Sequence, residues 1–208
     1  MTEKELVRRC KKKNAKAQKL LYQLYHGSLL GICMRYAKSK AEAEDVLQMA
    51  MMKIYTSINS FSGKGSFEGW LKRITINTAV DNFRKNSKHY YHDDVEDIEE
   101  QADGDVEFRD TLEVKDILKT IQQLPDGYRM VFNLYALEGY SHKEIAEKLG
   151  ITESTSKTQL LKARKKLKNM LTSLNRMPER SITIKSRDET DSTFNNNRLI
   201  MIDLILEK

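Results

Sequence analysis

The residues best suited to chemistry lie in the segment 154–168, which combines hydroxyl and basic side chains. Six of its last twelve residues are basic and none is acidic. Ammonium and guanidinium groups neutralise phosphate, and hydroxyl groups bond to phosphates and base edges. The segment therefore predicts a nucleic-acid-binding helix; the alternative is a helical hairpin with a solvated basic tail. The candidate contact residues are Ser154, Thr155, Lys157, Thr158 and Arg164.

The residues just before this segment predict how it is positioned. Ser141, followed three residues later by Glu144, has the spacing of a capping box at the start of a helix. Gly150 supplies a left-handed turn that ends this helix, and Thr152 caps the next one. Small Ala146 allows the two helices to cross closely. This is the spacing of a helix-turn-helix, whose second helix enters the major groove of DNA.

Two shorter helices are predicted before this pair. Amphipathic spacing marks residues 112–124, which end at Leu124-Pro125-Asp126-Gly127, and residues 128–137, which end at Glu138-Gly139. Proline and glycine at these positions stop helices. Residues 112–172 therefore form one predicted helical domain. After Ser173 the periodicity is lost, so residues 173–208 are predicted to be a disordered tail.

A second group of chemically suited residues follows a loop with glycines at 63 and 65. Ser66 is a candidate cap for the helix that starts there. Aromatic faces stack on exposed bases at roughly 1–3 kcal/mol each, and arginine neutralises phosphate, so one stripe of this helix suits a nucleic-acid strand. The alternative is that Trp70 is a core residue. The stripe consists of Trp70, Arg73, Asn77, Asp81 and Arg84.

The helix predicted after Ser39 has two different apolar faces. One is a core stripe, formed by Val46, Leu47, Ala50, Met51, Ile54, Tyr55 and Ile58. The opposite stripe holds Asp45, Gln48, Met49 and Met52. Two methionines facing water indicate a surface for a protein partner. The alternative is that both pack under a neighbouring helix.

Composition restricts the fold class and the partner. The chain has 208 residues, a net charge of +6 and a pI of about 9.1, which favours a polyanionic partner. Nine glycines and two prolines are too few for the turns of an all-β fold. We therefore expect an all-α protein. The segment from Glu5 to Tyr25 predicts one helix with a solvated basic face at its start.

Several classes of protein are excluded. The two cysteines, Cys10 and Cys33, form no CxxC pair and lie near no clustered histidine, which argues against a zinc finger or a disulfide scaffold and for a reducing compartment. No membrane span or signal core is predicted. The four histidines have no carboxylate or cysteine partners at ligand spacing, and no GxxxxGK loop occurs. We expect no metal, no cofactor and no enzymatic activity.

The charge is divided unevenly along the chain. Between Asp93 and Glu113 there are eleven acids and one base, a local charge of −10, which leaves +16 for the rest. So acidic a run with little apolar periodicity predicts a flexible linker, residues 91–111, between domains at 1–90 and 112–172. The alternative for part of the run is a solvated surface helix.

Several blocks together resemble one known family. In the first domain they are LLYQLY, AEDVLQMAMMKIY and GSFEGWLKRITINTAVDNFRK; in the second, LPDGYRMVFNLYALEGYSHKEIAEKLGITESTSKTQLLKARKKL. In this order and spacing they resemble the sigma-70 family of initiation factors, in its extracytoplasmic-function (ECF) group. The resemblance covers residues 15–172 and implies sigma region 2, a linker and sigma region 4. It implies a protein of the bacterial cytoplasm and nucleoid.

The resemblance also implies partners and roles for the candidate residues. Core RNA polymerase is expected to bind Asp45, Gln48, Met49 and Met52. The loop 61–66 and the helix after it are expected to open the promoter −10 element and to hold a flipped base, through Lys64, Phe67, Trp70, Arg73, Asn77, Arg84 and Lys85. The −35 element is expected to be read by Ser154, Thr155, Lys157, Thr158 and Arg164. Residues 134–139 are expected to help contact the polymerase flap, and an anti-sigma factor is an expected partner.

Two departures from the family pattern leave the −35 sequence open. Ser156 stands where the family often has valine, and Gln159 stands where it often has arginine. A different function also stays possible on the residues alone: a stand-alone helix-turn-helix regulator that binds an operator as a dimer. That reading predicts a sensor domain or a dimer helix, and neither the acidic run nor the Trp70 block resembles one.

Overall fold

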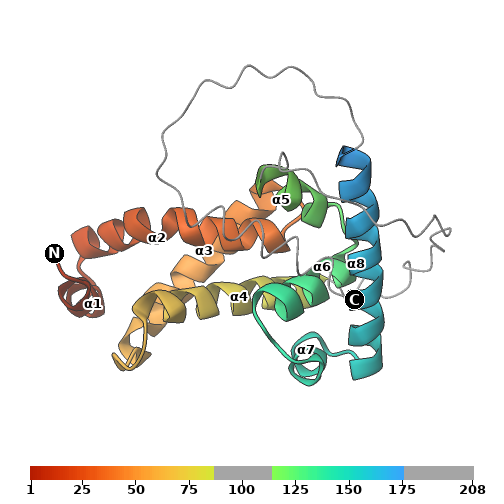
Figure 1. Cartoon of the computed structure of the whole chain (residues 1–208). Helices are drawn as coiled ribbons and strands as arrows, with labels where there is room; N and C mark the ends of the chain where they lie inside the picture. Colours follow the sequence, from red (N-terminus) through yellow and green to blue (C-terminus); the bar gives the residue numbers. More distant parts are fainter. Residues whose placement is uncertain (87–113, 176–208) are drawn as a thin grey trace, which may run out of the picture. The chain divides into compact units, whose positions relative to one another are not determined.

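The computed structural model describes residues 1–86 and 114–175, and all the regular structure in these ranges is helical (Figure 1). The predicted all-α class is therefore confirmed. The chain divides into two compact units, Met1–His92 and Asp93–Lys208. The predicted acidic linker, 91–111, lies outside the described residues, as does the predicted tail beyond residue 175. The bounds of the four predicted segments, 1–90, 91–111, 112–172 and 173–208, stay predictions.

Over residues 1–86, the described part of the first unit, there are four α-helices and one short 3₁₀-helix. They are α1 (Glu3–Lys11), α2 (Ala15–Tyr36), α3 (Lys40–Ser57), η1 (Ile58–Ser60) and α4 (Phe67–Asn86). The predicted single helix from Glu5 to Tyr25 is wrong, because the chain breaks between α1 and α2. Lys13 adopts a positive φ of 56°, and the Asn14 side chain accepts a hydrogen bond from the Ala17 backbone at 3.0 Å. Asn14 thereby caps a new helix.

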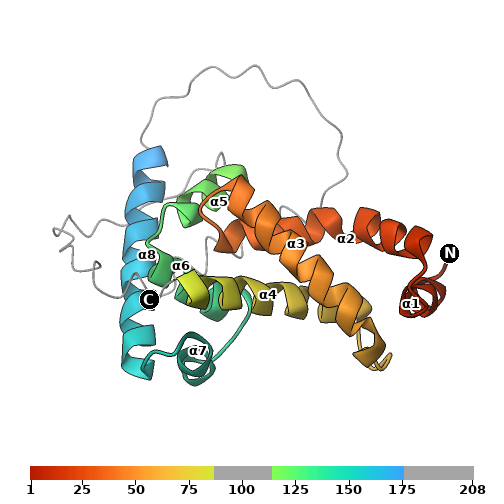
Figure 2. The ribbon, with the colours of Figure 1, turned by 180° about the vertical axis from the view of Figure 1, so that it is seen from behind.

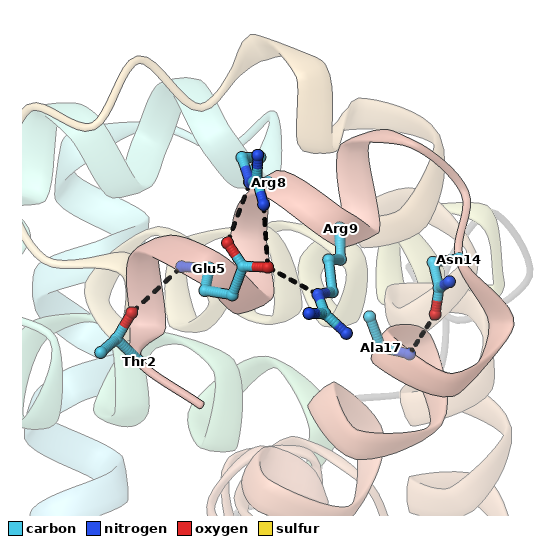
Figure 3. Close-up of polar contacts among 6 residues, drawn as sticks. All are labelled: Thr2, Glu5, Arg8, Arg9, Asn14 and Ala17. Carbon is cyan, nitrogen blue, oxygen red and sulfur yellow. Dashed lines mark hydrogen bonds and ion pairs between the residues drawn. The ribbon is translucent and has the colours of Figure 1, made fainter.

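Helix α1 carries an ion-pair cluster on its surface (Figure 3). Glu5 accepts hydrogen bonds from Arg8 at 2.9 and 3.0 Å and from Arg9 at 2.6 Å. These bonds lower the pKa of Glu5 to about 2, with Arg8 the larger cause. Part of the basic face predicted for this segment is therefore neutralised within α1 itself.

The core of the first unit lies among α2, α3 and α4, which pack side by side (Figures 1 and 2). The predicted core stripe of α3 is buried at Val46, Leu47, Ala50, Met51 and Ile54, and Ile58 follows it in η1. The Tyr55 hydroxyl donates to the Gln18 carbonyl at 3.0 Å and ties α3 to α2. The Lys53 ammonium binds Asp81 at 2.9 Å and ties α3 to α4.

The second unit is a set of helices around a long C-terminal one. The elements are α5 (Val114–Gln122), α6 (Asp126–Phe132), the π-helix η3 (Asn133–Leu137), α7 (His142–Leu149) and α8 (Glu153–Asn175). Helix α8 packs against α5, α6 and α7. The helix predicted over 128–137 begins earlier, at Asp126, and changes to π geometry at Asn133.

One buried arginine fixes the corner between α5 and α6. Arg129 is almost fully buried and donates to the carbonyls of Leu124 at 2.9 Å and Gln122 at 3.2 Å. It also pairs with the carboxylate of Asp126 at 2.7 Å. Arg129 therefore satisfies two carbonyls that the end of α5 leaves without intrahelical partners.

Candidate functional site

The helix-turn-helix predicted from spacing is formed by α7 and α8. Ser141 and Glu144 make the full capping box: the Glu144 backbone donates to the Ser141 hydroxyl at 3.3 Å, and the Ser141 backbone donates to the Glu144 carboxylate at 2.9 Å. The latter bond is the main cause of the lowered pKa of Glu144. Gly150 has a φ of 71°, and the Thr152 hydroxyl accepts from the Thr155 backbone at 3.0 Å. The predicted caps and turn are confirmed.

The exposed face of α8 contains three of the five residues that the sequence predicts to contact the −35 element. Ser154, Lys157 and Thr158 are exposed within one turn of each other. Thr155 is half-buried, and its hydroxyl lies 2.8 Å from that of Thr152, so it serves the helix cap as well. Hydroxyl and ammonium groups are thus available together at the start of the helix.

Arg164 does not point outward as predicted. It is half-buried, and its guanidinium carbon lies 5.9 Å from the centre of the Tyr135 ring in η3. A long arginine side chain packs its stem on apolar surface while its planar head stacks on an aromatic ring. Arg164 therefore links α8 to the π-helix.

The sequence reading missed Leu161, which is 71% exposed on α8. It lies one turn after Lys157 and Thr158, on the same face, next to exposed Lys162. An apolar side chain among basic ones suits the methyl group of thymine in a major groove. The adjacent Leu160 is buried with Ala163 and Leu167, at the spacing of one helix face. A leucine that falls outside this spacing was the available signal.

In the first unit, the predicted strand-binding site is built around an aromatic cluster. The Trp70 indole stacks on the Phe67 ring, with centroids 5.8 Å apart and planes at 15°. Phe61 lies 5.5 Å from Trp70 and 5.0 Å from Phe67, and Tyr25 meets Phe67 edge-on at 5.9 Å. Trp70 is half-buried, so it is neither a full core residue nor a free one.

The predicted contact of Phe67 with the −10 element is wrong. The Phe67 side chain has 0% exposure. Enclosed by Tyr25, Phe61 and Trp70, it has no surface left for a nucleic acid. It supports Trp70 from below, because a ring packed against the indole limits the indole's orientations.

The loop beside this cluster exposes a basic side chain. Lys64 is exposed between Gly63 and Gly65, whose φ angles of 77° and 83° need glycine. The Lys11 ammonium donates to the Phe61 carbonyl at 2.8 Å and anchors the start of the loop to α1. The loop is therefore fixed at its base and open at its tip.

The other residues of the predicted stripe follow Trp70 along α4. Arg73, Arg84 and Lys85 are exposed, and Asn77 is half-buried. Asp81, the acid on this stripe, is paired with Lys53. The surface along α4 consequently presents a ring, an amide and cations, which suits a strand with exposed bases and phosphates.

The opposite face of α3 is open within its unit. Asp45 and Gln48 are exposed, and Met49 and Met52 are 38% and 69% exposed. The alternative that both methionines pack under a neighbouring helix does not hold among the described residues. Exposed methionines are adaptable apolar contacts, which suits a protein partner.

Two further observations concern sites of other kinds. Within 1–86 and 114–175, no group of three histidine, cysteine or acidic side chains lies together in a way that could hold a metal ion. None of the helices described in these ranges is both long and apolar enough to cross a membrane.

Comparison with known proteins agrees with this arrangement. Residues 21–89 match the family "Sigma-70 region 2", and residues 115–167 match "Sigma-70, region 4". The chain is 32% identical over 181 residues to the RNA polymerase sigma-H factor of Pseudomonas aeruginosa, covering 81% of this chain and 93% of that protein. It is 30% identical over 182 residues to the ECF RNA polymerase sigma-E factor of Haemophilus influenzae, covering 82% and 96%.

A similar but more distant solved structure is that of the sigma factor RpoE with the anti-sigma factor NepR from Bartonella quintana. Its identity is 24%, its TM-score is 0.45, and the match covers 74% of this chain and 95% of that one. The assignment rests instead on the two family matches and on the sigma-H and sigma-E relatives. The chain belongs to the sigma-70 family of RNA polymerase sigma factors, in its ECF group.

Proposed function

We propose that this chain binds core RNA polymerase, directs it to promoters with defined −35 and −10 elements, and promotes opening of the DNA for initiation. One observation carries the proposal: a single chain has a helix-turn-helix with exposed hydroxyl and ammonium groups in one unit, and an accessible indole with exposed cations along α4 in the other. The first suits a DNA duplex and the second suits a single strand. A regulator that only binds a duplex has no use for the second surface.

The −35 element is read by the first turns of α8. The exposed Ser154, Lys157 and Thr158 offer hydrogen-bond groups to base edges and phosphates, and Leu161 offers an apolar contact. Thr155 is half-buried, and its hydroxyl offers DNA the hydrogen-bonding capacity that its contact with Thr152 leaves unused. Arg164 acts through its packing on Tyr135, which holds the middle of the helix against η3.

The −10 element is opened and captured at α4. Unstacking a base costs a few kcal/mol, and stacking on an aromatic ring returns roughly 1–3 kcal/mol per base. Trp70 offers that ring, while Lys64, Arg73, Arg84 and Lys85 offer phosphate contacts and Asn77 an amide. Opening therefore needs no ATP hydrolysis by this chain, and it has the role of a non-enzymatic specificity subunit.

Core RNA polymerase binds the open face of α3. Met49 and Met52 supply apolar area at its centre, and Asp45 and Gln48 supply polar contacts at its edge. Residues 134–139 add a second contact to the polymerase flap. An anti-sigma factor is a further partner, and the chain acts at the nucleoid in the bacterial cytoplasm.

The test is DNA binding with and without the polymerase. Tagged chain is mixed with core polymerase, recovered, and titrated with promoter fragments selected from genomic DNA of the source bacterium. We expect recovery of stoichiometric core and tight, sequence-selective binding only in the complex. Tight operator binding by a dimer of the free chain would instead support the stand-alone regulator.

A further inference from the structure

A polar pair of half-buried His142 and buried Ser156 joins the two helices of the helix-turn-helix. The Nδ1 atom of His142, at the start of α7, lies 2.9 Å from the hydroxyl oxygen of Ser156, in the first turn of α8. Ser156 has 0% exposure, so its hydroxyl depends on partners inside the protein. Valine, which the resemblance leads one to expect here, cannot make this bond.

Aromatic packing fixes the histidine ring in place. The Tyr135 ring of η3 stacks on it, with centroids 4.6 Å apart and planes at 22°. The Arg164 guanidinium lies over the same Tyr135 ring. The contacts are therefore continuous. They run from Ser156 on α8 to His142 on α7, then to Tyr135 in η3, and return to α8 at Arg164, one turn after Leu160.

This set of contacts acts on the residues that face DNA. Ser156 immediately precedes Lys157, and successive helical residues are about 100° apart around the axis. A tie at Ser156 therefore determines the direction in which Lys157 and Thr158 point. Hydrogen-bond readout of base edges requires such groups to be held in place by supporting contacts, because small displacements misalign them.

We propose that His142 is a positioning residue for −35 recognition, which fixes the rotation of α8 through its bond to Ser156. This inference rests on the proposed function of α8. Because Ser156 is buried and the bond joins α7 to α8, its loss changes how well bases are discriminated more than it changes overall attraction to phosphates.

The charges around the ring add a pH dependence. Burial lowers the pKa of His142 below its ordinary value of 6.5, and the cations of Lys157 and Arg164 lower it further, while Glu153 opposes them. The ring is therefore neutral in the working state. At lower pH, protonation adds a third positive charge beside these two cations and weakens the packing of α7 on α8. The stabilisation that the neutral His142 ring gives to this packing is fully present at a pH above its ordinary pKa of 6.5. It is lost as the pH falls through the lowered pKa of the folded protein.

The experiment uses the full chain with core polymerase and a promoter library with a randomised −35 element. The measured quantity is the ratio of transcription from the best selected −35 sequence to that from a scrambled one. We expect His142→Ala and Ser156→Ala each to lower the ratio about fivefold, and the double variant to lower it no further, because both remove one interaction. His142→Asn, whose amide occupies the position of Nδ1, should restore most of the ratio.

Two measurements separate positioning from stability. Ile121→Val is the matched control: it removes one buried methyl group in α5, which carries neither His142 nor Ser156, so it should lower the melting temperature and leave the ratio unchanged. Lowering the pH from about 7.5 to about 5.5 should lower the ratio for the wild type and leave it flat for His142→Asn. Ser156→Val keeps the site filled if the alanine variants unfold, and it should still lower the ratio.

Clear results would overturn the proposal. A ratio for His142→Ala or Ser156→Val equal to the wild-type ratio, or losses that simply add in the double variant, would show that the pair is only packing. A wild-type chain that selects no −35 sequence at all would contradict −35 reading by α8 itself, and the positioning role with it.

Discussion

The indole of Trp70 lies nearly parallel to the ring of Phe67, with centroids 5.8 Å apart. Phe67 is completely buried, whereas Trp70 is half-exposed. The two aromatic residues therefore have different roles. Phe67 belongs to the core and supports the indole, and the exposed part of Trp70 lies beside the loop 61–66.

Replacing each ring by alanine should distinguish the structural role of Phe67 from the strand-binding role of Trp70. Phe67→Ala should destabilise the first unit by about 3–5 kcal/mol, the usual loss for a buried phenylalanine. Trp70→Ala should cost less stability but should reduce opening of the −10 element, because the indole is needed once bases unstack. Thermal melts and the permanganate reactivity of −10 thymines measure the two effects. Normal opening of the −10 element by Trp70→Ala would contradict this role of the indole and would show that Arg73, Asn77 and the loop 61–66 capture the strand.

The open face of α3 should be required for core binding and dispensable for folding. Asp45→Lys combined with Gln48→Ala, or Met52→Glu alone, should strongly weaken binding to core polymerase without changing helicity, since these residues lie opposite the buried stripe. Lys40→Ala, at the start of the same helix, is the control. Unchanged affinity in a titration of labelled core would show that the exposed methionines have another role.

Lys157 and Arg164 should respond differently to alanine substitution, although the sequence placed them on one surface. Lys157 is exposed, so its loss should shallow the dependence of log K on log salt by up to about 0.9 for one phosphate contact. Arg164→Ala should lower the melting temperature of the chain more and change the salt slope less, because its side chain packs over Tyr135. Equal salt slopes for the two variants would contradict this division.

Arg129 should be among the most sensitive residues of the second unit. Arg129→Leu removes the guanidinium that donates to the carbonyls of Leu124 and Gln122 and to the carboxylate of Asp126. The Leu124 carbonyl is buried, and an unsatisfied buried group costs about 1–3 kcal/mol, so cooperative unfolding of this unit should shift to lower temperature. Calorimetry of the full chain measures it, with Lys143→Leu as an exposed control; a shift as small as the control's would be inconsistent with the buried network.

Local chemistry made the helix-turn-helix predictable. Its caps and its left-handed glycine depend on residues within a few positions of one another, and each is found at the predicted residue. The same kind of signal exists at Asn14, but the three lysines before it and the alanines and lysines after it have good helix propensity and concealed the break.

Long-range contacts explain what could not be predicted. Periodicity puts Phe67 and Trp70 on neighbouring stripes of one helix, but the burial of Phe67 comes from Tyr25 and Phe61, which belong to other segments. The direction of Arg164 depends on Tyr135, and the pairing of Ser156 depends on His142, fourteen positions earlier. Helical spacing contains no information about such partners.

The most direct test of the account is run-off transcription. Purified core polymerase free of other sigma factors is supplied with this chain and a promoter fragment selected by the complex, and the 5′ ends of the transcripts are mapped. The account predicts specific transcripts from a fixed start, which are absent without the chain and strongly reduced with Trp70→Ala or with Met52→Glu. No specific transcript, from a chain that is folded and that binds the same fragment without polymerase, would contradict it.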